Sequence, residues 1–208
     1  MPRAGLTAEG VIDAAATLAD EQGFDAITLA ALSERLGVKP PSLYKHVDGL
    51  DAIQRGVALK GIREMNGRVI HATIGLSRED ALVALAKAYW RFSCEHPGLY
   101  AATLRAAQPD NPEIEAAGGM FVGVVSAVLE GFGITGSDTL HAVRAVRAIV
   151  HGFVSLDATG AFGTGANVEE SFVRLIRTFA AGLASAGSMP PAEARSLLRL
   201  GRFSLRAG

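Results

Sequence analysis

Hydrophobic residues recur every three or four positions along most of the chain, which is the spacing that lines one face of an α-helix. No segment shows the alternation of apolar and polar residues that is typical of a strand. With 208 residues, 49% of them hydrophobic, the chain has enough apolar material for one large core or for a small domain joined to a larger one. We therefore expect an all-α protein.

The N-terminal part begins with two helical patterns. The first follows Thr7, a good N-cap, and ends at Gly23, and the second follows Thr28 and ends at Gly37 after about two turns. Their apolar faces are Val11, Ile12, Ala15, Leu18 and Ala19 in the first helix and Leu29, Leu32 and Leu36 in the second. A longer helix followed by a short one is therefore predicted.

A third helix is predicted from Pro40. Lys39 precedes a proline and is biased away from the α conformation, whereas Pro40 and Pro41 fit the first turn of a helix, where a missing N–H costs little. Leu43 and Val47 would lie on the buried face. The residues left to face outward are Ser42, Tyr44, Lys45 and His46.

Two short helices joined by a glycine-containing turn, after a longer supporting helix, form the arrangement that presents a helix to the major groove of DNA. A plain three-helix bundle with no partner satisfies the same apolar periodicity equally well. The periodicity alone leaves both interpretations open.

The rest of the chain also has a helical pattern. A fourth helix begins near Asp48 and runs past Met65, and further helices are expected at residues 78–95, 97–107, 112–132 and 140–158. Ser77 and Asn167 are the expected caps of the helix at 78–95 and of a last helix from residue 168. The glycine-rich segment 159–166 lacks the Lys-Ser/Thr pair of a phosphate-binding P-loop and is expected to be an ordinary loop.

Charge and cysteine content exclude several kinds of protein. The chain carries 20 Lys and Arg against 21 Asp and Glu, so overall charge gives no argument for nucleic-acid binding. Residues 1–50 are net acidic, and within them positive charge without an intervening acid occurs only from Arg35 to Val47. The single cysteine, Cys94, rules out an internal disulfide and a multi-cysteine metal site.

Three further expectations concern location and chemistry. The nearly uncharged stretch 116–129 is shorter than the roughly 20 residues of a membrane-crossing helix, so we expect a buried helix and no membrane association. The chain opens without a secretion signal, which favours the cytoplasm. The five histidines lie far apart in the sequence, so we expect neither an enzyme nor a metal or other cofactor.

Two segments resemble a known family. Residues 28–38 (TLAALSERLGV) and 42–47 (SLYKHV) are similar to the N-terminal domain of the TetR (tetracycline-repressor) family, over about residues 7–55. Residues 150–156 (VHGFVSL) and 160–163 (GAFG) resemble the C-terminal domain of the subgroup named for a Trp-His-Gly signature, with Val150 at the tryptophan position.

The resemblance implies a helix-turn-helix DNA-binding domain at residues 1–50, a connecting helix at 51–71 and a larger ligand-binding and dimerisation domain at 72–208. It implies that Tyr44, His46 and Thr28 contact phosphates. Lys45 would contact phosphates or guanine, and Lys39 and Ser42 would reach base edges. The apolar rings of Pro40 and Pro41 are expected to contact thymine methyl groups.

The implied function is a ligand-responsive transcriptional regulator, most simply a repressor, that binds a palindromic operator in double-stranded DNA as a homodimer and is released by a small-molecule effector. Residues expected in the ligand pocket are Tyr89, Trp90, Phe121, Arg147, His151 and Phe153. Residues expected in the dimer interface are Gly152, Ser155, Phe172, Ile176, Phe179 and Leu183. The alternative is an all-α small-molecule binding protein that does not bind DNA.

Overall fold

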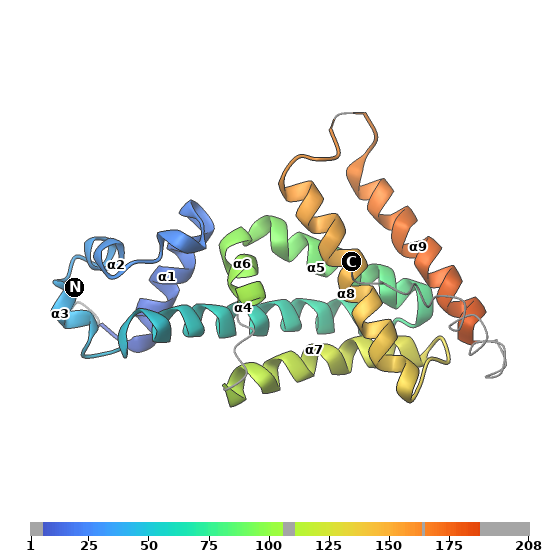
Figure 1. Ribbon diagram of the computed structural model, residues 1–208, viewed down its shortest axis with the longest axis horizontal. Coiled ribbons are helices and arrows are strands. Elements are labelled where there is room, and N and C mark those ends of the chain that lie inside the picture. Colours follow the sequence, from blue (N-terminus) through green and yellow to red (C-terminus); the bar gives the residue numbers. More distant parts are fainter. Residues whose placement is uncertain (1–5, 106–110, 164, 188–208) are drawn as a thin grey trace, which may run out of the picture.

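The computed structural model describes residues 6–105, 111–163 and 165–187, and over these residues it contains helices and no strands, which confirms the predicted all-α class. The helices in chain order are α1 (Ala8–Gln22), the 3₁₀ turn η1 (Phe24–Ala26), α2 (Leu29–Leu36), α3 (Pro40–Leu43), α4 (Gly49–Thr73), α5 (Arg78–Glu95), α6 (Pro97–Arg105), α7 (Pro112–Glu130), α8 (Ser137–Ala158) and α9 (Val168–Gly187). Helices α1 to α3 form a small unit at one end of the molecule, called the head below (Figure 1).

Helix α4 joins the head to the rest of the molecule. It contains 25 residues, which corresponds to a length of about 37 Å. It packs against α1 of the head and against α5, α6 and α7 of the C-terminal part (Figure 1). A change in the tilt of α4 would therefore move the head relative to the C-terminal part.

Some predicted helix caps form and one does not. The Thr7 hydroxyl accepts a hydrogen bond from the Gly10 N–H at 3.0 Å, and Asn167 Oδ1 accepts one from the Glu170 N–H at 3.0 Å. Ser77 occupies the N-cap position of α5, but its hydroxyl makes no capping hydrogen bond. The prediction of a Ser77 side-chain cap was wrong.

The segment expected to be a buried helix, residues 116–129, lies in α7, but this helix is covered on one side only. Val125 and Leu129 are buried, whereas Met120 and Val122 are exposed. Only 28% of the most apolar stretch of α7 is buried, so the prediction of a buried helix holds for one face alone. By length and composition, α7 is the one helix among the described residues that meets the requirements for crossing a membrane, a test that core helices of soluble proteins also pass.

The core of the C-terminal part is organised around α5, which packs against α4, α6, α7, α8 and α9. Its inner side chains Leu82, Leu85 and Phe92 are fully buried. Helices α8 and α9 lean on α5 and diverge from each other away from their connecting loop (Figure 1). This divergence leaves parts of both helices without cover from the same chain.

Candidate nucleic-acid interface and ligand pocket

The turn between α2 and α3 has the geometry that the sequence predicts. The Thr28 hydroxyl caps α2 by accepting a hydrogen bond from the Ala31 N–H at 3.1 Å. Gly37 ends α2 in the left-handed conformation, with φ of 65°, which glycine adopts without strain. The Val38 N–H then donates to the Ser33 carbonyl at 3.0 Å, and this bond closes the turn.

Helix α3 is short. Lys39 has the extended backbone expected before a proline, with φ of −80° and ψ of 147°, and Pro40 and Pro41 form the first turn. The backbone then continues as hydrogen-bonded turns, in which the N–H groups of His46 and Val47 both donate to the Leu43 carbonyl, at 2.9 and 3.1 Å. Leu43 and Val47 are buried against the head, as predicted, and this anchors the segment.

The outward side of this segment consists of the residues that the sequence singled out. Tyr44 is 57% exposed, so its ring is not part of the core of the head. Among the described residues, no hydrogen bond or ion pair engages the side chains of Tyr44, Lys45 or His46. Exposed residues of the predicted set are Thr28, Lys39, Pro40, Pro41, Tyr44, Lys45 and His46, and Ser42 is half-buried.

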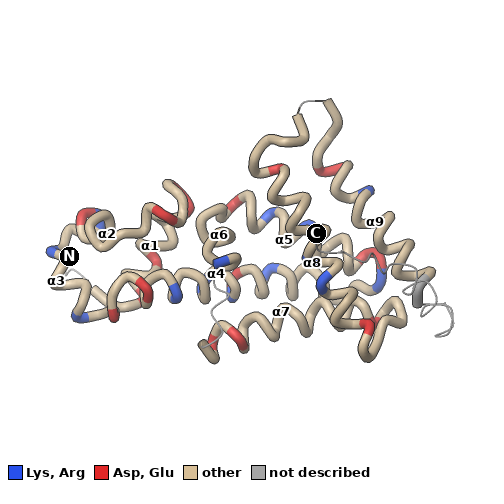
Figure 2. The backbone as a smooth tube through the Cα atoms, in the orientation of Figure 1, with Lys and Arg blue, Asp and Glu red and all other residues tan. Residues whose placement is uncertain are grey.

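The positive charge next to this surface is smaller than the sequence suggests. The Arg35 guanidinium makes two parallel hydrogen bonds to the Glu21 carboxylate, at 2.7 and 2.9 Å. The hydrogen bond from Arg35 lowers the pKa of Glu21 below its usual range. Figure 2 shows basic positions at the α3 end of the head and acidic positions on α1, on α2 and at the start of α4. Arg35 is therefore neutralised within the head, and Lys39 and Lys45 provide the free positive charge near α3.

A cavity of about 330 Å³ opens in the C-terminal part between α4, α5, α6, α7 and α8. Of the residues predicted for a ligand pocket, Tyr89, Phe121 and Arg147 line it. Its other walls are mainly apolar, and the sequence analysis did not single out most of these residues. They are Ile62, Met65, Thr103, Leu104, Ile114, Gly118, Val122, Leu140 and Val143, with Arg144 at the edge.

Three predicted pocket residues lie elsewhere. Trp90 and Phe153 pack against each other and against Phe172, and the Trp90 indole N–H donates to the Asp157 carboxylate at 2.7 Å. These rings form part of the core, because an aromatic residue at helical spacing faces whichever neighbour its helix packs against. His151 lies one layer behind the cavity, where its Nδ1 is 2.5 Å from the Tyr100 hydroxyl.

The cavity wall continues into a short polar chain. The Tyr89 hydroxyl donates to the Tyr100 hydroxyl at 3.3 Å, and Tyr100 in turn contacts His151. Burial raises the pKa of both phenols, so they remain neutral hydrogen-bonding groups at physiological pH. Tyr100 was not predicted, because its contact with His151 joins residues 51 apart in the sequence and has no local signal.

The predicted dimer-interface residues divide into two groups. Phe172, Ile176 and Leu183 of α9 are buried within the single chain, with Phe172 at 0% exposure, so they leave little surface for contact with a second subunit. They form the stripe that packs α9 on α5. Ser155 is exposed, and Gly152 and Phe179 are half-buried. Large exposed apolar residues nearby are Leu156, at 49%, and Leu175, at 37%.

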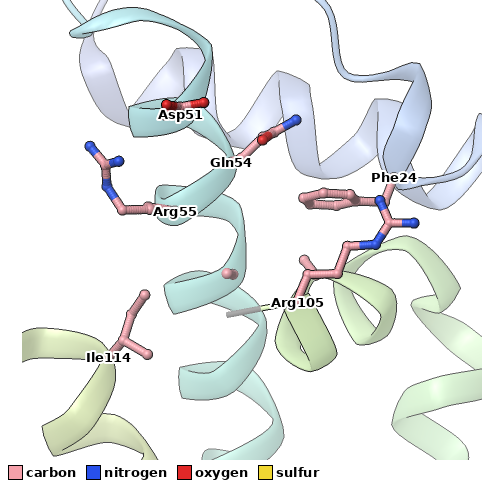
Figure 3. A pocket seen from close by; sticks show the side chains of 8 residues that line it. Phe24, Asp51, Gln54, Arg55, Arg105 and Ile114 are labelled. Carbon is pink, nitrogen blue, oxygen red and sulfur yellow. The ribbon is translucent and has the colours of Figure 1, made fainter. Parts of the chain in front are cut away.

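The head also contacts the C-terminal part directly, at α6. A second cavity, of about 230 Å³, lies at this junction, with Phe24 and Arg105 on one side of α4 and Arg55 on the other (Figure 3). The Arg105 guanidinium is ion-paired with Asp25 and lies over the Phe24 ring, 4.9 Å from its centroid. The hydrogen bond from Arg105 lowers the pKa of Asp25.

No group of three or more histidine, cysteine, aspartate or glutamate side chains is placed to hold a metal ion in the part of the chain that the structure describes. Two potential metal ligands that are adjacent in the sequence, Glu95 and His96, make structural contacts instead. Glu95 pairs with Arg68, and His96 Nδ1 lies 2.8 Å from the Asp20 carboxylate.

Comparisons with known proteins agree with this geometry. Residues 11–48 match the family described as "Bacterial regulatory proteins, tetR family", and residues 82–179 match the "Tetracyclin repressor-like, C-terminal domain". An uncharacterized HTH-type transcriptional regulator of Bacillus subtilis, YobS, is 37% identical over 183 residues, which cover 88% of this chain and 95% of that protein.

Two solved structures have the same fold. A protein of unknown function from Rhodococcus sp. RHA1 superposes with a TM-score of 0.76 at 22% identity, covering 88% of this chain and 98% of the other. A TetR variant from Acinetobacter baumannii in complex with minocycline superposes with a TM-score of 0.67 at 22% identity, covering 89% and 100%. The matching head, the matching C-terminal part and the near full-length relative show that this chain is a transcriptional regulator of the TetR family.

Proposed function

We propose that the protein is a cytoplasmic, ligand-responsive repressor that binds a palindromic operator as a homodimer and releases it when a small molecule occupies the C-terminal cavity. The observation that carries the DNA-binding part is the exposure of Tyr44, beside Lys45 and His46, on a segment anchored by buried Leu43. A large aromatic side chain left in solvent next to two polar ones is typical of a surface that meets a partner.

The DNA-facing residues divide into two roles. Tyr44, His46 and Thr28 hold phosphates, and Lys45 joins them or reaches guanine. Lys39 and Ser42 lie at the start of α3 and face base edges. Of these, Ser42 is half-buried, so its reach is the shortest. The rings of Pro40 and Pro41 are exposed and meet thymine methyl groups.

The dimer forms through the α8–α9 flank, which we define as Ile149, Gly152 and Leu156 of α8 with Leu175 and Phe179 of α9. These residues are exposed or half-buried in the single chain, and a second copy would cover them. An isologous contact of this kind relates the two heads by a two-fold axis, as a palindromic operator requires.

The effector site is the cavity between α4, α5, α6, α7 and α8. Its volume and mainly apolar walls are those of a small-molecule site, and a protein of the same fold has been solved with minocycline bound. Both α4 and α6 contact the cavity and the head, so a ligand that favours one tilt of these helices favours one spacing of the two heads.

The test is an electrophoretic mobility shift with the DNA flanking the gene and with a pool of random duplexes. The wild-type dimer is expected to select a palindromic site. Tyr44→Ala is expected to weaken binding by roughly tenfold or more, since a hydrogen bond to a charged group contributes about 1.5–3 kcal/mol. Gln22→Ala, an exposed position on α1, is the matched control. Failure of the wild type to select any palindrome, or equal affinity for Tyr44→Ala, would contradict the proposal.

A further inference from the structure

Two positively charged side chains line the C-terminal cavity. Arg144 and Arg147 lie one turn apart on α8 and both line it, and no aspartate or glutamate is among its described lining residues. The other polar groups are the Tyr89 phenol and the Thr103 hydroxyl. The cavity therefore offers hydrogen-bond donors and two positive charges, with no acid to balance them.

Neither arginine has a carboxylate partner in the described part of the chain. The two acidic residues of α9 are already engaged, because Glu169 pairs with Lys87 and Glu170 pairs with Arg174. Two like charges three residues apart on one helix face repel each other. An anion placed between Arg144 and Arg147 relieves that repulsion and accepts their N–H groups in a planar, bidentate geometry.

The remaining walls are apolar and fix the other end of the ligand. Ile62, Met65, Phe121 and Val143 come from three different helices and face the same space. The cavity volume of about 330 Å³ lies near the lower limit of small-molecule sites, which span about 300–1,000 Å³. The site thus suits a compact ligand with an apolar body and a single polar end.

We propose that the effector is an organic acid, with a carboxylate held by Arg144 and Arg147 and an apolar body among the side chains of α4, α7 and α8. This inference rests on the proposed function, because it assigns a ligand class to the same cavity. It goes further in predicting that binding depends on the negative charge of the ligand. A neutral or cationic ligand with the same body fits the walls but leaves both guanidinium groups unpaired.

The experiment is isothermal titration calorimetry on the full-length protein without DNA. Two series of probes share one body each: decanoate, 1-decanol and decylamine, and 2-naphthoate, 2-naphthalenemethanol and 2-naphthylmethylamine. At least one acid is expected to bind, with its alcohol binding at least about tenfold more weakly and its amine more weakly still.

Arg144→Gln and Arg147→Gln are each expected to weaken binding of the acid by about tenfold or more and to leave binding of the alcohol unchanged. Arg174→Gln, on the exposed side of α9, is expected to change neither.

Three outcomes would overturn the inference. They are equal binding of acid and alcohol in both series, no binding of either acid up to 1 mM in wild-type protein, and unchanged acid binding by both arginine variants. Operator binding by the ligand-free protein is measured in parallel. Loss of operator binding there contradicts the proposed function, whereas an intact operator complex with charge-independent ligand binding contradicts the ligand class alone.

Discussion

The Asp20 carboxylate at the end of α1 accepts a hydrogen bond from the Leu99 backbone N–H in the first turn of α6, at 2.9 Å. Its other oxygen lies 2.8 Å from His96 Nδ1. The first N–H groups of a helix have no partner within the helix, and a carboxylate there is favoured by the helix dipole as well. The head thus supplies the cap of a helix that lines the ligand cavity, and the two parts of the molecule are joined at α6 as well as through α4.

This junction leaves no room at Gly98. A Cβ atom there would lie 2.0 Å from the carbonyl carbon of Ala19 and 2.2 Å from its oxygen, and backbone atoms cannot move aside as a flexible side chain does. We expect Gly98→Ala to force α1 and α6 apart and to lower the free energy of unfolding by about 1–3 kcal/mol. For a chain of this size that corresponds to a fall in Tm of roughly 2–12 °C, measurable by thermal unfolding.

Gly67→Ala is the matched control for this change. Gly67 lies on the exposed side of α4, and a Cβ there would have no atom within 4 Å. Because alanine favours a helix more than glycine does, by about 1 kcal/mol, Tm should rise slightly. An unchanged Tm for Gly98→Ala would show that α1 and α6 are not in close contact in solution.

The sequence predicted most of the helices because local signals determine them. Gly37 ends α2 in a left-handed conformation, and Pro40 and Pro41 begin α3. The conformational preferences of glycine and proline alone predict both boundaries. The exposed position of Tyr44 also follows from the spacing of its buried neighbours. The head could therefore be predicted almost completely from its own residues.

The C-terminal part was harder to predict, since its contacts join residues far apart in the chain. The stripe of α9 that includes Phe172 was assigned to a dimer interface, but it packs on α5. Helical periodicity identifies an apolar face without telling which neighbour covers it. The contact between Tyr100 and His151, 51 residues apart, has no local signal for the same reason.

The exposed apolar residues of α8 and α9 lead to a prediction about assembly. Leu175 lies on the α8–α9 flank and is 37% exposed in the single chain. Leu175→Arg would place a charge in the centre of the proposed interface, where an unpaired buried charge costs several kcal/mol. We expect a monomer in sedimentation-velocity experiments at micromolar concentration, together with loss of operator binding. Ala181→Arg, at an exposed position on the same helix outside this flank, should remain dimeric. If Leu175→Arg stays dimeric, the interface lies elsewhere.

The ion pair between Asp25 and Arg105 gives a prediction about pH. Hydrogen bonding and charge attraction from Arg105 hold the pKa of Asp25 below the usual value of 3.8. A lowered carboxyl pKa stabilises the folded state fully above the unfolded pKa, and this contribution is lost as the pH falls through the folded pKa. Asp25→Asn should therefore lower Tm slightly near neutral pH, and the difference from wild type should shrink as the pH falls below about 4, the unfolded value, and through the lowered folded pKa. Because the pair is exposed, added salt should reduce the difference.

The control for this titration is Glu34→Gln, which removes one negative charge from an exposed position outside the ion pairs of the described residues. Its Tm should follow that of the wild type across the same pH range. A Tm difference for Asp25→Asn that does not shrink between about pH 5 and pH 1, or that is equal for both variants, would contradict a specific contribution from the pair.

The scarcity of free positive charge on the head predicts how operator binding responds to salt. Arg35 is held by Glu21, so Lys39 and Lys45 provide the free lysine or arginine charges near α3. Each phosphate neutralised contributes about 0.9 to the slope of log K against log salt, and we expect a modest total slope. If Lys45 neutralises one phosphate in each half-site, Lys45→Gln should reduce the slope by about 1.8 and weaken binding to all sequences equally.

The control is Lys60→Gln. Lys60 pairs with Asp13 and Glu64, so this change should leave the slope unchanged. If Lys45→Gln leaves the slope unchanged but relaxes the preference at one base pair, Lys45 contacts guanine instead. A steep slope for the wild type would show that more positive charges contact the DNA than the two lysines near α3 provide.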